Sequence, residues 1–436
     1  MSVKLSCFLF IITCSIYGQQ LDSLVHYSHF TSAELVLGKT QDANSGFPDT
    51  KLQKSLILSF GNYNDQNQDE WAYRLRYPRT GISFAITDYG NPEYIGYSAS
   101  VLPFMEFDFL RKNHKDLKMN VGVGASYFTN KYDSVPFPLN NVPENTNRAI
   151  STKITWAFKL FFHYEFLKKE KASWKVGAGY FHQSNGHTRL PNQGLNSFLF
   201  SVSRQSNYNY KKRKPLKDSH SNPSFNKSVQ DYFTFRTGAG LNVLSEVYNN
   251  KKGVYTVAGS YGKIINKTFK IGLGFYYRYY EQYNNYIKND GELVVEKYPH
   301  FQENAFKYAT NYGVFITSEF LLGHIGFEVD LGYNIYKPFY EVEWQLNQGF
   351  YWEFQNDNGT TELKYILGEL DGYYKVKKAI SARLGLKYYL ISNQKSPKSN
   401  VFIACHINAN LGQADFTELS IGYVHRFKLK NKDRLN

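Results

Sequence analysis

Two polar side chains that could together hydrolyse an ester lie two residues apart, at His182 and Ser184, and Asn196 follows them after a short turn. A histidine that accepts the proton of a serine hydroxyl lets the oxygen attack a carbonyl carbon, while a third group holds the imidazole in place. These residue types therefore point to acyl transfer through a serine nucleophile. The surrounding elements must bring the three side chains together.

Alternation in the two segments that flank the turn predicts such a meeting. Residues 174–185 read WKVGAGYFHQSN, in which His182 and Ser184 continue an otherwise apolar face. Residues 195–203 read LNSFLFSVS, and there Asn196 shares its face with aromatic and aliphatic residues. Neighbours on the same face of a strand are about 6 to 7 Å apart. If this apolar face meets lipid, polar groups on it are costly unless they are partnered or functional. We therefore expect His182, Ser184 and Asn196 to have a function.

The same period of two dominates the rest of the chain. Residues 154–166 read ITWAFKLFFHYEF, with an aromatic face that is too apolar for water but suits lipid. We therefore predict an all-β fold, a transmembrane antiparallel up-and-down β-barrel of about fourteen strands, with twelve to sixteen tenable. The weakest strands are expected at residues 52–60 and 71–77. Further alternating segments are residues 117–128, 231–244, 270–280, 314–327, 379–390 and 417–429.

The composition excludes three other classes of protein. The 37 Tyr, 34 Phe and 5 Trp make 17% of the chain aromatic, whereas a disordered chain would lack such residues. Three cysteines are too few for a disulfide scaffold. A mean hydropathy of −0.48, with no apolar run of about 18 to 20 residues after the N-terminus, excludes a bundle of transmembrane helices.

The N-terminus is typical of an export signal. Lys4 precedes an apolar stretch at residues 5–16, and the small residue Gly18 precedes the expected cleavage point. We expect residues 1–18 to be a signal peptide. Residues 19–436 are then expected to form a single outer-membrane β-barrel domain with long extracellular loops.

The cysteines raise one alternative to a cleaved signal peptide, which is a lipoprotein signal. Cys14 would suit a lipoprotein, although Thr13 is larger than the residue that usually precedes a lipidated cysteine. Removal of the signal would leave Cys405 as the one cysteine, so that no internal disulfide could form. We expect Cys405 to be a small apolar side chain on a strand.

Loop lengths agree with a barrel, in which short periplasmic turns alternate with longer outer loops and both termini are periplasmic. Counted back from the last strand, the long segments at residues 282–305 and 337–373 fall on the outer side. Short turns near Asn266 and at residues 322–323 fall on the periplasmic side. Residues 209–228 are an exception, because this long basic segment also falls on the periplasmic side. It indicates either a misjudged strand or an unusual basic turn.

The stretch HQSNGHTRLPNQGLN, residues 182–196, resembles the active-site signature of the lipid A 3-O-deacylase family. These outer-membrane hydrolases remove an ester-linked acyl chain from lipopolysaccharide. Their His-x-Ser-Asn and Pro-Asn-x-Gly motifs correspond here to residues 182–185 and 191–194. Residues 77–91, YPRTGISFAITDYGN, are similar to bacterial acyloxyacyl hydrolase relatives. The resemblance covers about residues 71–203, and only the general barrel pattern continues beyond.

The resemblance implies a role for each residue of the motif. Ser184 would be the nucleophile and His182 its general base. Asn185, Gly186 and Asn192 would bind the oxyanion or position the substrate. Oxyanion donors of this kind are typically worth about 3 to 4 kcal/mol each.

One position departs from the family pattern. Where the family has the acid of its triad, this chain has Asn196, whose carbonyl can still accept the imidazole N–H, as in Cys-His-Asn proteases. Glu246 is an alternative source of a carboxylate. His187 and Arg189, in the same turn, are either ligands of a sugar or phosphate or solvated loop tips.

These observations predict an outer-membrane serine acyl-ester hydrolase that removes a hydroxyacyl chain from lipid A of lipopolysaccharide. The alternative is a non-catalytic outer-membrane barrel with a transport, adhesion or structural role. The formal charge of +14 suits lipopolysaccharide phosphates. We expect lipid A and membrane lipid as partners, no nucleic acid, no metal and no cofactor, because no corresponding motif occurs. The acyl position that is cleaved and the oligomeric state stay open.

Overall fold

A computed structural model describes residues 28–109, 116–132, 147–169, 172–207, 225–355, 361–428 and 430–431. The expected signal peptide and most of the basic segment at residues 209–228 lie outside this described part. Long antiparallel strands dominate the chain, as the alternation predicts. Of the helices in the described ranges, none has the length and apolar character needed to cross a membrane.

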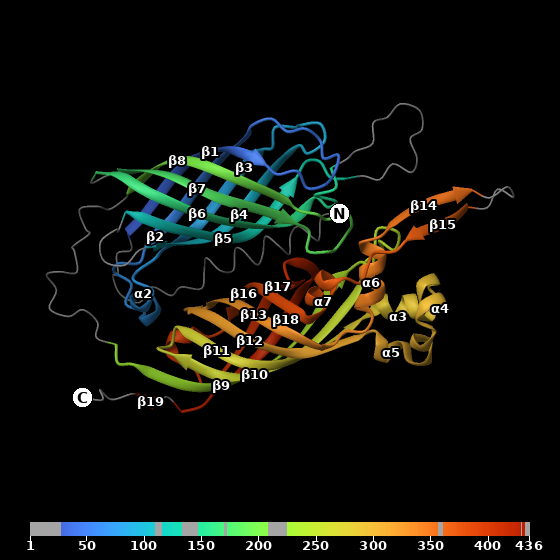
Figure 1. Ribbon diagram of the computed structural model, residues 1–436. Helices are drawn as coiled ribbons and strands as arrows, with labels where there is room; N and C mark the ends of the chain where they lie inside the picture. Colours follow the sequence, from blue (N-terminus) through green and yellow to red (C-terminus); the bar gives the residue numbers. More distant parts are fainter. Residues whose placement is uncertain are drawn as a thin grey trace, which may run out of the picture.

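The first eight strands form a closed barrel, here called barrel 1 (Figure 1). Each strand pairs with its neighbour in sequence, and β8 closes the barrel against β1. The strands are β1 (Ser28–Thr40), β2 (Gln53–Tyr63), β3 (Arg79–Asp88), β4 (Tyr97–Asp108), β5 (Leu117–Phe128), β6 (Ile154–Lys168), β7 (Ala172–Ser184) and β8 (Leu195–Asn207).

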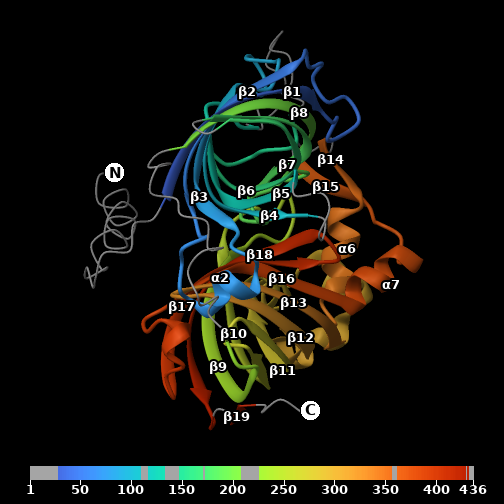
Figure 2. The ribbon, with the colours of Figure 1, turned by 90° about the vertical axis from the view of Figure 1, so that its left-hand side faces the viewer.

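A second closed sheet, barrel 2, lies beside barrel 1 (Figures 1 and 2). Its ring closes because β9 pairs with both β10 and β18, and the short β19 (Lys430–Asn431) extends the pairing of β9. The strands are β9 (Ser228–Asn242), β10 (Lys252–Ile265), β11 (Phe269–Tyr280), β12 (Thr310–Leu322), β13 (Ile325–Tyr336), β16 (Ile380–Tyr389), β17 (Ser399–Asn410) and β18 (Gln413–Arg426).

The expectation of a single barrel of about fourteen strands is therefore wrong. The long strands of both barrels share the same period-two pattern, and this pattern does not say which strands pair to close a ring. The long segment on the periplasmic side follows β8 and precedes β9, so it connects the two barrels. The expected strand at residues 71–77 is also wrong, because the short helix α2 (Glu70–Arg74) occupies this connection, with Trp71 buried.

The predicted long outer loops of barrel 2 carry helices and a small hairpin. Aromatic and aliphatic residues of the first loop pack into a buried cluster over this end of the barrel. The elements are α3 (Glu281–Lys288), α4 (Glu292–Lys297), η2 (Pro299–Asn304), α5 (Ala305–Tyr308), α6 (Tyr340–Asn347), β14 (Phe350–Gln355), β15 (Thr361–Ile366) and α7 (Gly372–Ala379). At the periplasmic end, η3 (Asn393–Lys395) lies between β16 and β17.

Burial alternates along the strands as a membrane barrel requires. Outward residues such as Phe200 and Leu273 are 71% and 67% exposed, whereas their strand neighbours are buried or half-buried. The apolar faces thus meet lipid and the polar faces fill the interiors. Cys405 lies on β17 as a free thiol.

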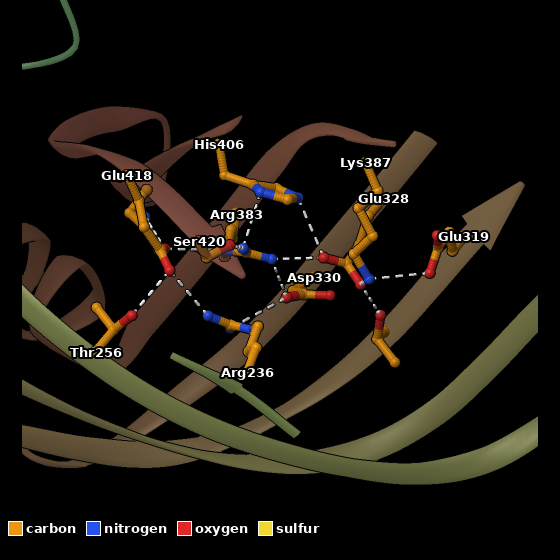
Figure 3. Close-up of polar contacts among 12 residues, drawn as sticks. Arg236, Thr256, Glu319, Glu328, Asp330, Arg383, Lys387, His406, Glu418 and Ser420 are labelled. Carbon is orange, nitrogen blue, oxygen red and sulfur yellow. Dashed lines mark hydrogen bonds and ion pairs between the residues drawn. The ribbon is translucent and has the colours of Figure 1, made fainter. Parts of the chain in front are cut away.

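Charged side chains fill the interior of barrel 2 around Arg383 (Figure 3). Its guanidinium donates to Glu418 Oε2 at 3.1 Å and lies 2.8 Å from His406 Nδ1 and 3.4 Å from Asp330 Oδ2. Glu328 forms a further ion pair with Arg383. Barrels of eight strands are just wide enough for side chains to fill, so this network acts as a plug.

Barrel 1 is filled in the same way. His163 Nε2 lies 2.8 Å from Glu34 Oε1, and Lys175 Nζ lies 2.8 Å from Glu106 Oε1. All four side chains are buried. Because these side chains fill the interior, a site that reaches lipid can lie only on the outer surface of barrel 1.

Candidate active site

His182 and Asn196 are direct cross-strand partners between β7 and β8. Asn196 Oδ1 lies 2.7 Å from His182 Nδ1 and also accepts a hydrogen bond from Tyr180 Oη at 2.5 Å. Because an amide oxygen only accepts, Nδ1 of His182 must carry the proton. The lone pair of the imidazole is then on Nε2, which is the tautomer that a general base needs.

Ser184 is the last residue of β7, on the same outward face as His182. It is 6% exposed and pairs across the sheet with Trp156 of β6. Within the described part of the chain, its hydroxyl has no hydrogen bond, including none to His182. Catalytic hydrogen bonds are often formed only when substrate is bound. The structure therefore puts the two side chains on one face of β7, as the alternation predicts, without a hydrogen bond between them.

The predicted oxyanion residues divide into two groups. Asn185 holds the turn: its Nδ2 donates to Ser151 Oγ at 2.9 Å and to Arg189 O at 2.7 Å, and its backbone N–H donates to Asn192 Oδ1 at 2.9 Å. All N–H groups of Asn185 are therefore occupied. Among the described residues, the backbone N–H of the buried Gly186 and the Nδ2 of the half-buried Asn192 have no hydrogen-bond acceptor.

The turn after Ser184 is held against barrel 2. Asn249 accepts from Leu190 N–H at 2.9 Å and donates to Leu190 O at 2.6 Å. Gly186 O accepts from Thr417 Oγ1 at 3.5 Å, and the same hydroxyl oxygen accepts from Trp156 Nε1 at 3.0 Å. Barrel 2 thus fixes the turn at several points. Sequence alone could not assign these contacts, because they join residues far apart in the chain.

Gly186 is required here for two reasons. Its φ of +65° is in the left-handed region, where a side chain is strained. A Cβ at this position would also lie 2.2 Å from Thr417 Oγ1. Any larger residue would therefore push the turn and barrel 2 apart.

His187 is a buried contact to barrel 2, and is neither a solvated loop tip nor exposed to a ligand. It is 4% exposed, and its Nε2 lies 4.0 Å from Glu343 Oε1 of α6. Arg189 is exposed. Glu246 is paired with Arg148, so it does not provide the free carboxylate considered as an alternative to Asn196.

Burial sets the protonation of the residues at this contact. It lowers the pKa of His187, which is therefore neutral at pH 7. Burial, together with the nearby carboxylate of Asp415, raises the pKa of Glu343 to about 7, against the attraction of Lys337 and a hydrogen bond from Tyr283. The ordinary value for a glutamate is 4.5.

This shift predicts a pH-dependent stability. The folded state binds the Glu343 proton more tightly than the unfolded state. Protonated Glu343 therefore contributes to the free energy of unfolding below about pH 4.5, and this contribution is lost as the pH rises towards 7. At 1.36 kcal/mol per pKa unit, the loss is about 3 kcal/mol as an upper bound. We expect Glu343→Gln, which is neutral throughout, to unfold at a higher temperature than wild type at pH 8 and at a similar temperature at pH 4.5.

Heat-induced unfolding in detergent micelles, followed by electrophoretic mobility, would measure this difference. Glu341→Gln, on the same helix but at a partly exposed ion pair, is the matched control. If the unfolding temperatures of Glu343→Gln and wild type differ by the same amount at pH 4.5 and at pH 8, the prediction is contradicted.

No group of three or more His, Cys, Asp or Glu side chains in the described ranges is arranged to hold a metal ion. The polar groups of the site are side chains and backbone amides of barrel 1. They comprise an oriented imidazole, a hydroxyl on the same face and two N–H donors without an acceptor among the described residues.

Two family models match the chain, one in each barrel. The model of lipid A 3-O-deacylase (PagL) matches residues 59–205, which include the whole site. The model of the acyloxyacyl hydrolase C-terminal domain matches residues 229–354. No protein of curated function matches the sequence.

Among solved structures, the outer membrane enzyme PagL aligns with 39% of this chain and 97% of its own, at 15% identity and a TM-score of 0.28. The transport unit of the autotransporter AIDA-I from Escherichia coli aligns with 97% of both chains, at 6% identity and a TM-score of 0.16.

The fold and the family models define a β-barrel protein of the bacterial outer membrane. The chain belongs to the lipid A 3-O-deacylase and acyloxyacyl hydrolase family. The predicted resemblance is thereby confirmed, and the match extends into barrel 2, where the sequence analysis recognised only strands.

Proposed function

We propose that this protein is a serine hydrolase that removes a hydroxyacyl chain from lipid A. The observation that carries the proposal is the 2.7 Å contact between His182 and Asn196, beside Ser184, on the outward face of barrel 1. This arrangement gives the imidazole the tautomer of a general base. It lies inside the segment that matches the deacylase family.

In the proposed mechanism, His182 Nε2 accepts the proton of Ser184 as Oγ attacks the ester carbonyl. The N–H of Gly186 and the Nδ2 of Asn192 stabilise the oxyanion, each by about 3 to 4 kcal/mol. The imidazolium returns its proton to the sugar oxygen as the ester bond breaks. Water, activated by His182, then releases the hydroxy fatty acid from Ser184. Asn196 keeps the imidazole oriented in both steps.

The position of the site supports a substrate that is already in the membrane. Ser184 is at the outer end of β7, where the turn at residues 185–194 leaves the barrel. A lipid of the outer leaflet can reach this face without leaving the bilayer. The exposed Arg189 lies in the same turn and offers a positive charge to a lipid A phosphate.

Barrel 2 supports the site from the side. Its contacts with Gly186, His187 and Leu190 restrict the turn that carries both oxyanion donors. A misplacement of about 1 Å can cost 10²-fold in rate, so a rigid support for this turn has catalytic value. The transport alternative is less well supported, because charged side chains fill both barrel interiors.

Covalent labelling tests the proposal directly. A long-chain fluorophosphonate, which reacts with activated serines, should label Ser184 of the folded wild-type protein in detergent micelles. Incubation with lipid A should release a hydroxy fatty acid, detected by mass spectrometry. A folded protein that shows neither labelling nor release would contradict the proposed function.

A further inference from the structure

A large apolar cleft lies between the two barrels, separate from the polar site. Its volume is about 590 Å³. Met105 of β4 and Val121 of β5 contribute to one wall, and Phe320, Leu322 and Phe327 of β12 and β13 to the other. The burial pattern shows that all five side chains point outward from their own barrel, as lipid-facing residues do.

The cleft lies in the periplasmic half of the molecule. Leu322 ends β12, just before the periplasmic turn, while Trp71 and Leu75, in and directly after α2, also line the cleft. The N–H of Glu70 donates to Gln394 Oε1 at 3.1 Å, which joins α2 to η3 of barrel 2. Figures 1 and 2 place α2 between the barrels at this end.

The walls define what can occupy this space. An empty space of this size would forfeit dispersion contacts along both walls, and water would find almost no hydrogen-bond partner in it. A peptide is equally unsuitable, because its backbone amides would be unsatisfied. A hydrocarbon chain suits these walls, because outward, apolar side chains of both barrels form them.

The depth of the cleft argues against an acyl chain of the proposed substrate. Val121 pairs with Leu160 of β6, and Ser184 pairs with Trp156 on the opposite side of the same strand. Four residues separate Trp156 from Leu160, or about 13 Å along the strand. Met119 and Phe107, which also line the cleft, lie further still towards the periplasm, where the leaflet consists of a different lipid from that at the site.

We propose that the cleft binds an acyl chain of an anionic glycerophospholipid from the periplasmic leaflet. Two exposed cations are available for its phosphate: Arg76 directly follows Leu75, which lines the cleft, and Lys395 directly follows Gln394, which binds α2. A lipid in this position would contact both barrels at once. This inference rests on the membrane location of the barrels and is independent of the proposed hydrolase activity.

A photoreactive lipid tests the binding site. Full-length protein, stripped of loosely bound lipid in detergent, is incubated with phosphatidylglycerol that carries a diazirine on an acyl chain, and is then irradiated. We expect crosslinks in the peptides that contain Met105, Val121 or Phe320. Crosslinks spread evenly over other outward residues, such as Phe200 and Leu273, would overturn the proposal.

Variants provide an independent measurement. Val121→Trp fills the cleft, and we expect it to lower the phosphatidylglycerol retained in native mass spectrometry at least tenfold. Val202→Trp, on the exposed face of β8, is the matched control and should retain the lipid. Equal retention by both variants would overturn the proposal, as would crosslinking of the cleft by lipid A but not by phosphatidylglycerol.

Discussion

Ser184→Ala should lower the rate of hydroxyacyl release from lipid A by at least about 10⁴-fold while the protein stays folded. The alanine removes the oxygen that attacks the ester, and in serine hydrolases loss of the nucleophile removes most of the catalysis. The change also removes no hydrogen bond, because the Ser184 hydroxyl has none among the described residues. Steady-state kinetics of the purified variant in detergent micelles would measure the loss.

Ser197→Ala is the matched control for this variant. Ser197 lies on β8 of the same hairpin, but it points into barrel 1 and is fully buried. Within the described structure its hydroxyl also lacks a hydrogen-bond partner, so its removal should be tolerated. We expect Ser197→Ala to keep the wild-type rate. A similar loss in both variants would mean that Ser184 acts through the structure and not as a nucleophile.

Asn196→Leu is expected to have the second largest effect, a loss of about 10²- to 10⁴-fold in kcat. Leucine has a similar size but cannot accept the proton of His182 Nδ1, so that the imidazole loses both its tautomer and its orientation. Asn196→Asp should act in the opposite direction. Its carboxylate keeps the hydrogen bond and adds a negative charge that stabilises the imidazolium, which we expect to raise kcat about tenfold or more.

Tyr180→Phe tests whether Asn196 acts through its hydrogen bonds or only through packing around His182. It removes only the second hydrogen bond to Asn196 Oδ1 and keeps the ring beside His182. A modest decrease in kcat, smaller than that of Asn196→Leu, is expected. If kcat of Asn196→Leu equals that of wild type in the same assay, Asn196 has no role in orienting the base.

The meeting of His182 and Asn196 could be predicted because it depends on local information. The turn sets the register of the hairpin, and alternation then fixes the face of each side chain. The role of Asn185 could not be predicted, because its amide hydrogens bond to Ser151 and Arg189, whose positions depend on the fold. The burial of His187 likewise depends on barrel 2.

The strands themselves were predictable, whereas their grouping into two barrels was not. Pairing of β9 with β18 joins residues almost two hundred positions apart, and a period of two carries no information about such distant partners. Trp71 shows a related limit. Its segment is short and apolar enough for a strand, but its burial beside barrel 2 favours the helix α2.

The most direct test of the central claim is mass spectrometry of lipid A from cells that lack lipid A deacylases and express this chain. The proposed function predicts that wild-type protein removes the mass of one hydroxyacyl chain and that Ser184→Ala, present in the same membrane at the same level, removes none. Unchanged lipid A in cells that contain folded wild-type protein would contradict the claim that this protein is a lipid A deacylase.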